Sequence, residues 1–471
     1  MRKTKIVCTI GPASDSPEMI EKLIRAGMNV ARLNFSHGTH EEHLGKIRLI
    51  RQIAAKLGRA VGILQDLPGP KIRIGKIEGG KAILLPGREY VFTTKEVEGN
   101  GERVTLPFPS LPGQIRRGQS IYVDDAKLEF KVVSTTETDI VTKVVIGGEL
   151  GSNKGFTVPG AEYDVPGVTD KDREDLRFGL EHGVDWVASS FVRSADDIVP
   201  LRKVMREVGR RVPLVAKIER PEAVKNIVSI IEAYDGIMVA RGDLGIELPI
   251  DEVPVIQKRI IRHANRVGKP VITATQMLDS MMSNPRPTRA EVTDVANAII
   301  DGTDATMLSG ETAVGAFPVE AVKIMDAVAR RVEKSRDFRT VCSDRMDYAT
   351  HDVTEAIGEA AAKLACDIGV AAIITCTFGG TTARLVSKYR PEAPIIAAAS
   401  NEETARRLAL SWGVEPIFVE MAKDTDGLIR NAVEASADYK LVKKGDTVLV
   451  LAGVPVGAPG NTSLIRVLKV E

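Results

Sequence analysis

Short apolar runs rich in Val, Ile and Ala recur along the chain, and most are followed by a polar loop and then a helical pattern. The runs are too continuously apolar to have a solvent-facing side, which is typical of parallel strands covered by helices. Eight such runs lie in the first two thirds of the chain: Lys5–Ile10, Met28–Phe35, Ala60–Leu67, Asp185–Val192, Pro213–Glu219, Gly236–Arg241, Pro270–Met277 and Asp304–Ser309. Eight strand–helix units predict an α/β fold, a (β/α)8 TIM barrel.

Helical periodicity fills several of the segments between these runs. Thr39 and Glu42 have the spacing of a capping box, which predicts that a helix begins directly after Thr39. The segments with helical periodicity are Pro17–Ala26, His40–Leu57, Lys171–His182, Ala195–Val208, Asp251–Val267 and Val319–Lys334.

The strand–helix alternation is interrupted between the third and fourth runs. From about Pro70 to Val165, short strands are separated by Gly, Pro, Asn and Asp turns. We expect these strands at Lys71–Ile77, Lys81–Leu85, Glu89–Thr93, Ser120–Val123, Leu128–Val133 and Asp139–Val145. The pattern predicts a small β-barrel domain inserted in a barrel loop, and an insertion on the catalytic face can act as a lid.

A second alternation of helices and strands follows Lys334 and predicts a C-terminal α/β domain of about five strands. Its elements are expected at Glu355–Ile368, Val370–Thr377, Gly379–Lys388, Pro394–Ser400, Glu402–Trp412, Val414–Val419, Gly427–Tyr439, Thr447–Ala452 and Ser463–Val470. The predicted domains are residues 1–69 and 167–334 for the barrel, 70–166 for the lid and 335–471 for the C-terminal domain.

Composition narrows the class of protein. Hydrophobic residues make up 44% and charged residues 27% of the chain, and the net charge of +1 gives no general attraction to nucleic acid or to an anionic membrane. The four cysteines, Cys8, Cys342, Cys366 and Cys376, lack CxxC spacing and are expected to be buried, reduced thiols. The basic start is followed too soon by Gly11 and Pro12 for a signal peptide, so we expect a cytoplasmic protein.

The ends of the predicted strands are unusually polar, and in a barrel the functional residues lie at the carboxyl ends of the strands. Six runs end in polar sequence: Ala31-Arg32-Leu33-Asn34-Phe35-Ser36-His37, Gln65-Asp66, Ala216-Lys217-Ile218-Glu219-Arg220, Ala240-Arg241-Gly242-Asp243, Ala274-Thr275-Gln276 and Leu308-Ser309-Gly310-Glu311. We expect three cations (Arg32, Lys217, Arg241) and three carboxylates (Asp66, Glu219, Asp243) to converge at one rim.

A rim of this kind suits phosphoryl transfer. Glu219 and Asp243 are the kind of carboxylate pair that holds Mg²⁺ or Mn²⁺ while leaving positions for water and substrate. Arg32 and Lys217 suit a phosphoryl group, because its transfer needs positive charge and positioning. Backbone amides after Arg241 could bind a carboxylate. The alternative is a network of ion pairs without a catalytic role, which would not require Thr275 and Ser309 at the same rim.

Other motifs do not support competing chemistries. The chain contains neither a GxxxxGK[ST] phosphate loop nor a GxGxxG dinucleotide fingerprint. His37, His40 and His43 are spaced so that they fan around a helix, and we expect a solvated first helical turn rather than a metal site.

Several long motifs closely resemble the pyruvate kinase family: MNVARLNFSHG, KIER, MVARGDLGIE, ITATQMLDSM, PRPTRAEVTDVANAI and DGTDATMLSGETA. The resemblance covers the whole chain. It implies a cytoplasmic glycolytic phosphotransferase that moves a phosphoryl group from phosphoenolpyruvate to ADP through an Mg²⁺-stabilised enolate. It also implies a homotetramer.

The resemblance assigns roles to residues at matching positions. Arg32 and Lys217 would contact the phosphoryl group, and Lys217 would also stabilise the enolate oxygen. Glu219 and Asp243 would bind Mg²⁺. The remaining assignments are Gly242, Asp243 and Thr275 for the substrate carboxylate, Thr275, Ser309 and Glu311 for protonation of the enolate through water, and Pro12, His37, Arg73 and Lys154 for the nucleotide.

A monovalent-cation site is implied at Asn34, Ser36, Asp66 and Leu67. Potassium-dependent members of the family often read DTKGPEIR, whereas this chain reads DLPGPKIR, with Lys71 where the Glu would be. A fixed ammonium there can replace K⁺, so we expect activity without K⁺. The alternative is that Lys71 points to solvent.

The C-terminal segment Thr377-Phe378-Gly379-Gly380-Thr381-Thr382 matches the family's effector site for phosphorylated ligands. We expect a phosphorylated effector at Thr377, Gly379, Gly380, Thr381 and Thr382, with Gly453–Asn461 as the facing loop. An ordinary turn with threonine capping is the alternative.

Two other functions remain open at this point. One is a metal-dependent lyase or aldolase acting on pyruvate enolate, which an ADP-dependent assay would distinguish. The other is a sugar-phosphate sensor that kept the barrel as a scaffold, which the intact charged rim disfavours.

Overall fold

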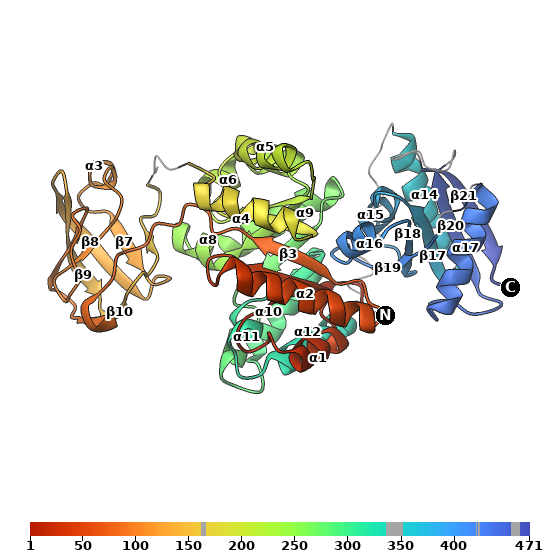
Figure 1. The fold of residues 1–471 in the computed structure, drawn as a ribbon, viewed down its shortest axis with the longest axis horizontal. Helices are drawn as coiled ribbons and strands as arrows, with labels where there is room; N and C mark the ends of the chain where they lie inside the picture. The colour runs from red at the N-terminus through yellow and green to blue at the C-terminus, as the bar shows by residue number, and fades with distance from the viewer. Residues whose placement is uncertain (162–165, 336–351, 421, 423, 454–461) are drawn as a thin grey trace.

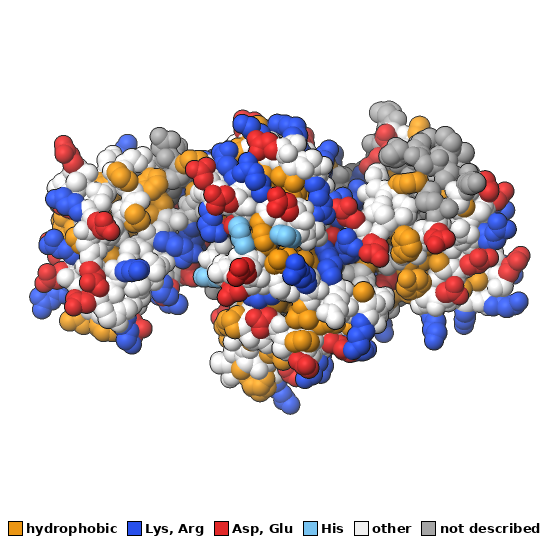
Figure 2. Space-filling model, in the orientation of Figure 1, with side chains coloured by type: hydrophobic (Ala, Val, Ile, Leu, Met, Phe, Trp, Pro, Cys, Tyr) orange, Lys and Arg blue, Asp and Glu red, His pale blue; other side chains and the backbone are white. Residues whose placement is uncertain are grey.

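The structure is a computed structural model that describes residues 1–161, 166–335, 352–420, 422, 424–453 and 462–471. Figure 1 shows three parts in a row: the inserted β-strands at one end, the barrel in the middle and the C-terminal α/β part at the other end. On the face in Figure 2, cationic and acidic side chains are interspersed over all three parts.

The central part is a closed barrel of parallel strands, as the apolar runs predict. The ring order is β1-β16-β15-β14-β13-β12-β3-β2. The strands are β1 (Lys5–Thr9), β2 (Val30–Asn34), β3 (Gly62–Asp66), β12 (Trp186–Ser189), β13 (Leu214–Ile218), β14 (Gly236–Ala240), β15 (Val271–Ala274) and β16 (Ala305–Leu308). The TIM barrel prediction is confirmed.

Helices cover the outside of this ring. The longer ones are α1 (Pro17–Ala26), α2 (His40–Lys56), α4 (Asp170–Glu181), α5 (Ile198–Val208), α9 (Val253–Arg266), α10 (Arg289–Asp301) and α12 (Pro318–Val332). The short ones are α6 (Pro221–Lys225), α7 (Ile227–Ala233), α8 (Arg241–Glu247), α11 (Gly310–Ala313), η2 (Ala195–Asp197) and η3 (Asp279–Met282). The segment expected as one helix at Ala195–Val208 is therefore η2 followed by α5.

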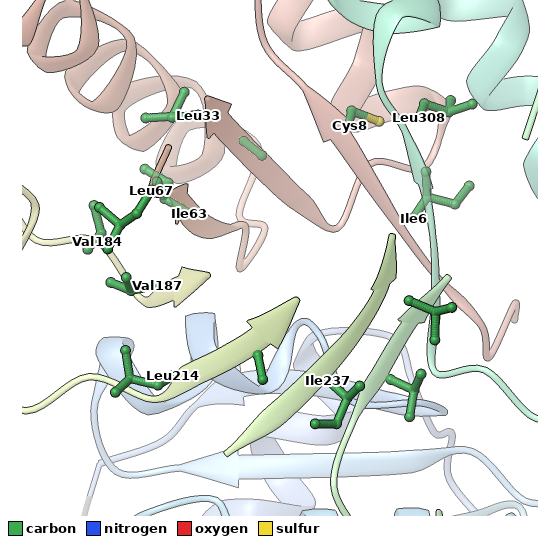
Figure 3. Packing of buried hydrophobic residues seen from close by; sticks show 14 of the residues in the cluster. Ile6, Cys8, Leu33, Ile63, Leu67, Val184, Val187, Leu214, Ile237 and Leu308 are labelled. Atoms are coloured by element: carbon green, nitrogen blue, oxygen red, sulfur yellow. The ribbon is translucent and has the colours of Figure 1, made fainter. Parts of the chain in front are cut away.

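Alternate residues of each strand enter two different cores. Ile6 and Cys8 of β1 pack in the layer between strands and helices, whereas Val7 packs inside the barrel. Figure 3 shows Ile6, Cys8, Leu33, Ile63 and others in the outer layer. Burying one Val, Leu or Ile side chain contributes about 1.5–3 kcal/mol, so both layers stabilise the barrel.

The helix starts follow from local sequence. Thr39 accepts a hydrogen bond from the Glu42 amide, and the Glu42 side chain accepts one from the Thr39 amide, so the predicted capping box is confirmed. The first turn of α2 is less solvated than expected. His43 is buried against Phe35, with ring centroids 3.9 Å apart, and His40 Nε2 lies 2.7 Å from Asp175 Oδ1.

The insertion between β3 and β12 consists of two sheets around one apolar core. A six-stranded sheet has the order β11-β7-β8-β9-β5-β6, and β10 pairs with β4. The elements are η1 (Glu78–Gly80), β4 (Lys81–Leu84), β5 (Glu89–Thr93), β6 (Arg103–Thr105), α3 (Leu111–Gln114), β7 (Ser120–Val123), β8 (Leu128–Thr135), β9 (Asp139–Ile146), β10 (Gly148–Gly151) and β11 (Phe156–Thr157). The inserted β domain is therefore present, and its role as a lid stays a prediction.

The prediction of a strand at Lys71–Ile77 is wrong. The segment makes only isolated bridges, Arg73 with Gly155 and Ile77 with Gly99. The amide of Ile74 donates to the Lys154 carbonyl, while that of Gly75 donates to the Thr105 carbonyl, so successive residues pair with different strands. Because these residues hydrogen-bond to different segments, they cannot form a continuous ladder with one strand.

The C-terminal part is a five-stranded sheet with the order β19-β18-β17-β20-β21, and its predicted strands are confirmed. The strands are β17 (Ala372–Thr377), β18 (Ile395–Ala399), β19 (Val414–Phe418), β20 (Thr447–Gly453) and β21 (Thr462–Lys469). The helices are α14 (Val353–Ile368), α15 (Thr381–Lys388), α16 (Glu402–Leu408) and α17 (Thr425–Asp438). The domain boundaries at residues 70, 167 and 335 remain our proposal.

Other expectations from the sequence have mixed outcomes. Cys8 and Cys376 are buried free thiols, but Cys366 is exposed because it lies on the outer face of α14, and Cys342 lies outside the described residues. Within the described ranges, the structure contains no helix long and apolar enough to cross a membrane.

Candidate active site

The carboxyl ends of the barrel strands place a compact charged cluster at one rim. Arg32 projects from β2, Asp66 ends β3, and Lys217 lies on β13 with Glu219 directly after it. Asp66 is only 1% exposed, and its carboxylate bridges the two cations: Arg32 Nε lies 2.6 Å from Oδ2, and Lys217 Nζ lies 3.3 Å from Oδ1. The strand register therefore brings together residues that are far apart in the sequence.

The charges in this cluster fix one another's ionisation. Burial favours the neutral form of Asp66, but Lys217 and Arg32 outweigh that effect and lower the pKa of Asp66 below its usual value. Burial likewise opposes the charge on Lys217, yet Asp66 and Glu219 raise its pKa. Lys217 is thus held as a cation at the rim.

Glu219 is positioned by both its oxygens. Its Oε1 lies 2.9 Å from Lys217 Nζ, and its Oε2 accepts a hydrogen bond of 2.6 Å from the Phe191 amide. Burial raises the pKa of Glu219; Lys217 opposes the shift and Asp243 reinforces it. A cation near both carboxylates would relieve that repulsion.

Ser190 is a site residue that we did not predict. Its hydroxyl lies 2.6 Å from Lys217 Nζ, accepting from it, and donates to the Leu67 carbonyl at 2.7 Å. The signal was present in the sequence: Ser190 directly follows β12, as the predicted site residues follow their own strands. Thr9 is a second residue that we did not predict. It accepts from Arg32 Nη1 at 2.9 Å, and its position at the end of β1 is the same kind of signal.

The cluster opens into a cavity of about 310 Å³ between the barrel rim and the insertion. Barrel residues and insertion residues both contribute to its wall. They are Arg32, Asn34, Ser36, His37, Pro68, Lys71, Arg73, Asp124, Asp125, Lys154, Gly155, Ser190, Phe191, Lys217, Glu219 and Asp243. The size suits a small organic substrate together with phosphate groups.

Asp243 faces this cavity with a lysine beside it. Lys71 Nζ lies 3.0 Å from Asp243 Oδ1 and 3.6 Å from Asp125 Oδ1. Burial opposes the charge on Lys71, but these carboxylates together raise its pKa. Lys71 therefore points into the site and not to solvent.

The four residues expected to bind a monovalent cation make contacts within the protein. Asn34 Oδ1 accepts from the Ser36 amide at 3.1 Å, and Asp66 is paired with Arg32 and Lys217. Leu67 accepts from Ser190 through its carbonyl. Lys71 lines the same cavity and pairs there with Asp243.

Arg241 does not join the cluster, contrary to expectation. Its Nη1 donates to Asp294 on α10 at 2.7 Å, and its Nη2 donates to the Thr275 carbonyl at 2.8 Å. Thr275 has a φ of 70°, a conformation that is unfavourable for a β-branched residue. Arg241 therefore holds the loop after β15 in place instead of lining the cavity.

The threonine held by this loop contacts the start of α8. Thr275 Oγ1 accepts from the Gly242 amide at 2.7 Å and donates to the Ala274 carbonyl at 2.6 Å. A side chain at Gly242 would meet Thr275 Oγ1 at 3.4 Å, an ordinary contact, so close approach does not by itself require glycine there.

Ser309 and Glu311 lie behind the rim after β16. Glu311 is buried, and its two oxygens accept from the amides of Leu278 (3.0 Å) and Ser309 (2.7 Å). Burial raises the pKa of Glu311, an effect that these amides oppose. Ser309 Oγ is buried and has no hydrogen-bond partner among the described residues.

The residues expected near a nucleotide divide into two groups. His37, Arg73 and Lys154 line the cavity, whereas Pro12 lies in an exposed turn after β1 and does not. Lys154 Nζ lies 2.9 Å from Asp124 Oδ1 within the insertion. Burial lowers the pKa of His37, and the Arg73 and Arg32 charges add to the shift.

The insertion is fastened to the barrel near its end by Arg220. Arg220 donates to the Ala161 carbonyl at 3.0 Å and pairs with Glu247 at 3.0 Å. Burial raises the pKa of Glu247 to about 7; Arg220 opposes the shift, and Glu222 and Asp243 reinforce it.

A pH dependence follows from Glu247. Its folded pKa lies above the ordinary 4.5, so its contribution to stability is complete below about pH 4.5 and is lost as pH rises to about 7, by about 3 kcal/mol at most. We expect Glu247→Gln to remove that slope from urea unfolding midpoints measured between pH 4.5 and 8. The exposed Glu232→Gln should keep it; equal slopes in all three proteins would contradict the assignment.

The effector segment of the C-terminal part forms a turn into α15. Thr377 Oγ1 accepts from the Gly380 amide at 3.0 Å, and Gly380 has a φ of 84° before the helix begins at Thr381. Thr382 Oγ1 lies 2.7 Å from Thr462 Oγ1 on β21. Of the facing loop predicted at Gly453–Asn461, residues 454–461 lie outside the described residues.

Metal chemistry at the rim rests on two carboxylates. No group of three or more His, Cys, Asp or Glu side chains that could hold a metal occurs in the described part of the chain. Glu219 and Asp243 fit an ion that takes few protein ligands and keeps water or substrate oxygens in its remaining positions, as Mg²⁺ does.

Comparison with known proteins identifies the family of this chain. The family model for the pyruvate kinase barrel domain matches residues 1–322, and that for the pyruvate kinase alpha/beta domain matches residues 355–468. A pyruvate kinase of Geobacillus stearothermophilus is 50% identical over 469 residues, covering 99% of this chain and 80% of that protein. One from Staphylococcus aureus (strain USA300) is 47% identical over the same share of each.

A solved structure of a pyruvate kinase from Cryptosporidium parvum superposes with a TM-score of 0.92 at 39% identity, covering 100% of this chain and 96% of that one. The family models, the identity along the whole of this chain and the shared fold agree with one another. The chain belongs to the pyruvate kinase family and is a phosphotransferase.

Proposed function

We propose that this protein transfers the phosphoryl group of phosphoenolpyruvate to ADP, giving pyruvate and ATP. One observation carries the proposal: Arg32 and Lys217 converge on buried Asp66 beside Glu219, at the wall of a cavity that the insertion also lines. In the reaction the bond between phosphorus and the enol oxygen breaks, a bond to a terminal ADP oxygen forms, and the enolate carbon takes a proton.

Arg32 and Lys217 bind the phosphoryl group in this proposal. Transfer of phosphoryl needs positive charge aimed at the equatorial oxygens and little covalent help from the protein. Asp66 keeps both side chains fixed, so their charges are in place before substrate binds. Lys217 also faces the enol oxygen, where negative charge develops as the phosphorus leaves.

Glu219 and Asp243 would hold Mg²⁺, or Mn²⁺. Burial raises the pKa of Glu219 and the Asp243 charge adds to the shift, and a cation near this pair would offset both effects. When bound, the ion supplies positive charge to the substrate oxygens. In the protein alone, Lys217 pairs with Glu219 and Lys71 pairs with Asp243.

The remaining rim residues orient the substrate and manage its proton. Thr275 and the amides of Gly242 and Asp243 would hold the carboxylate once the Gly242 amide exchanges its hydrogen bond to Thr275 Oγ1 for one to the substrate. The proton for the enolate carbon would come through water near Thr275, Ser309 and Glu311. The hydroxyl of Ser309, which is buried and has no hydrogen-bond partner among the described residues, offers a hydrogen-bonding position for such a water.

The nucleotide would enter from the side of the insertion. His37 at the rim and Arg73 and Lys154 of the insertion supply polar and cationic groups to the shared cavity. Pro12, in the exposed turn after β1, belongs to this group only by the family resemblance. Since the insertion carries two of the cations, its closure would bring them toward the phosphates.

A coupled assay with phosphoenolpyruvate, ADP and Mg²⁺ tests the function. Pyruvate and ATP should form in equal amounts, and omission of ADP or chelation of the metal should abolish both. Formation of pyruvate without ADP would instead favour a lyase or phosphatase.

We propose that Lys71 replaces a monovalent cation, so activity should not require K⁺. The Lys71→Glu variant should lose about tenfold or more of its activity in tetramethylammonium buffer and regain it with K⁺, because it adds a negative charge next to Asp243. Exposed Lys76→Glu, on the same segment, is the matched control. Strict K⁺ dependence of the unchanged protein would contradict the assignment.

We further propose, from the family resemblance, a cytoplasmic homotetramer regulated by a phosphorylated effector at Thr377, Gly379, Gly380, Thr381 and Thr382. The turn before α15 supports an anion there, because it presents amides at a helix start. Sedimentation and activity measured across phosphorylated metabolites would test both parts.

A further inference from the structure

A second cavity, of about 480 Å³, lies between the barrel and the C-terminal part. Its barrel wall comes from residues that precede strands: Arg211–Pro213 before β13, Asp235 before β14 and Val267–Lys269 before β15. Those positions mark the amino end of the barrel, opposite the catalytic rim. Its other wall comes from α14, α15 and α16. We call it the interdomain cavity.

Positive charge dominates this cavity. Five cationic side chains line it (Arg211, Lys269, Arg384, Lys388, Arg407) against two acidic ones (Asp235, Glu355). Lys388 Nζ lies 2.6 Å from Glu355 Oε2, so that acid is already paired. Asp235 accepts from the Leu214 amide at 3.0 Å. Four cationic side chains (Arg211, Lys269, Arg384 and Arg407) therefore share the cavity with one remaining carboxylate, that of Asp235.

Two of the arginines have hydrogen-bonding capacity left over. Arg407 Nε is buried and has no hydrogen-bond partner among the described residues, although its Nη2 pairs with Glu403 at 2.6 Å. Arg384 donates to the Gly379 carbonyl at 3.3 Å and has no carboxylate in ion-pair distance within the described chain. Burial lowers the pKa of Arg384; Asp235 opposes the shift and Arg407 reinforces it. Neighbouring, partly desolvated guanidinium groups are costly unless an anion joins them.

The cavity also has an apolar wall. Trp186, Val212, Pro213, Val267 and Leu385 line it beside the charged groups. The Trp186 ring is held in place because its Nε1 donates to the Arg407 carbonyl at 3.0 Å. A fixed aromatic ring next to arginines suits a ligand with both a phosphate and a flat or apolar portion.

We propose that the interdomain cavity binds a small organic phosphate, with the phosphate on Arg211, Arg384 and Arg407 and the organic portion against Trp186 and Leu385. Arginine forks hold phosphate by paired, charge-assisted hydrogen bonds. This site overlaps the effector turn only at Gly379 and Thr381. Thr382 of the turn faces Thr462 on β21, whereas Arg384 and Leu385, further along α15, face the barrel.

The two places share one corner, because Gly379 and Thr381 also line the interdomain cavity. One helix, α15, thus begins at the effector turn and forms a wall of the cavity. A ligand that pulls Arg384 toward the barrel would change the position of the turn, so occupancy of one place would alter affinity at the other.

Titration calorimetry of the full chain with adenosine 5′-monophosphate, adenosine and inorganic phosphate tests the proposal. The monophosphate should bind more tightly than either fragment, since each fragment lacks one of the two recognised features. Arg211→Glu and Arg384→Gln should each weaken its binding about tenfold or more, equal to about 1.4 kcal/mol. The exposed Arg262→Gln on α9 should leave it unchanged.

Arg211 is exposed, so its variant reports on the cavity even if Arg384→Gln folds poorly. Three results would overturn the proposal: no binding of the monophosphate, binding that is unaffected by Arg211→Glu, and binding lost only on Thr382→Val. The last two would place the ligand at the catalytic cavity or at the effector turn, respectively.

Discussion

Lys217→Met should lower kcat by about 10²–10³-fold or more, the loss that follows removal of one fixed electrostatic stabiliser. Methionine keeps most of the side-chain volume and removes the charge that lies 2.9 Å from Glu219 and 2.6 Å from Ser190. That charge meets the phosphoryl oxygens and the developing enolate in our proposal. Steady-state kinetics in the coupled assay would measure the loss.

The control for this variant is Lys323→Met, on the exposed face of α12. It makes the same chemical change far from the rim and should retain the parent kcat. Far-ultraviolet circular dichroism would verify that both variants are folded. A kcat near the parent value for Lys217→Met would refute the phosphoryl-transfer role of the rim.

Asp66→Asn should destabilise the barrel by about 3–5 kcal/mol, as expected when a buried ion pair loses one partner. Arg32 would keep only its hydrogen bond to Thr9, and Lys217 would keep Glu219. Urea unfolding followed by the fluorescence of Trp186 and Trp412 would measure the change. The exposed Asp251→Asn should behave like the parent.

The same substitution has a signature in acid. Because Arg32 and Lys217 lower the pKa of Asp66 below its ordinary 3.8, the stability from this carboxylate is present above about pH 4 and is lost as pH falls through the folded pKa. The stability gap between parent and Asp66→Asn should therefore narrow in acid. A gap that stays constant down to pH 2 would contradict the ionised bridge.

The barrel could be predicted because each of its strands is a short apolar run followed by a turn and a helix. The small strands β10 and β11 could not, since Gly148-Glu149-Leu150-Gly151 and Phe156-Thr157 are too short to show alternation. Their pairing depends on β4 and β7, which are distant in the sequence. The strand predicted at Lys71–Ile77 is absent for a related reason: successive residues of this segment hydrogen-bond to different segments.

The residues of the rim were predictable from their place at strand ends, but the directions of their side chains were not. Arg241 comes directly after β14, a position like that of Lys217 near the end of β13. Its side chain nevertheless donates to Asp294, which is 53 positions away on α10. Lys71 gave no local sign that it would reach Asp243. Such choices depend on tertiary partners, so strand position alone cannot supply them.

The insertion between β3 and β12 has a consequence for how the chain folds. The two strands are neighbours in the ring, and the Ile63 amide donates to Asp185, 122 positions later. Closing so long a loop carries a large entropic cost if the intervening chain is disordered. The insertion has its own apolar core, so it can collapse first and bring its two ends together. The barrel would then close only after the insertion has folded. Mutations in the core of the insertion would therefore slow the folding of the barrel, although they lie outside it.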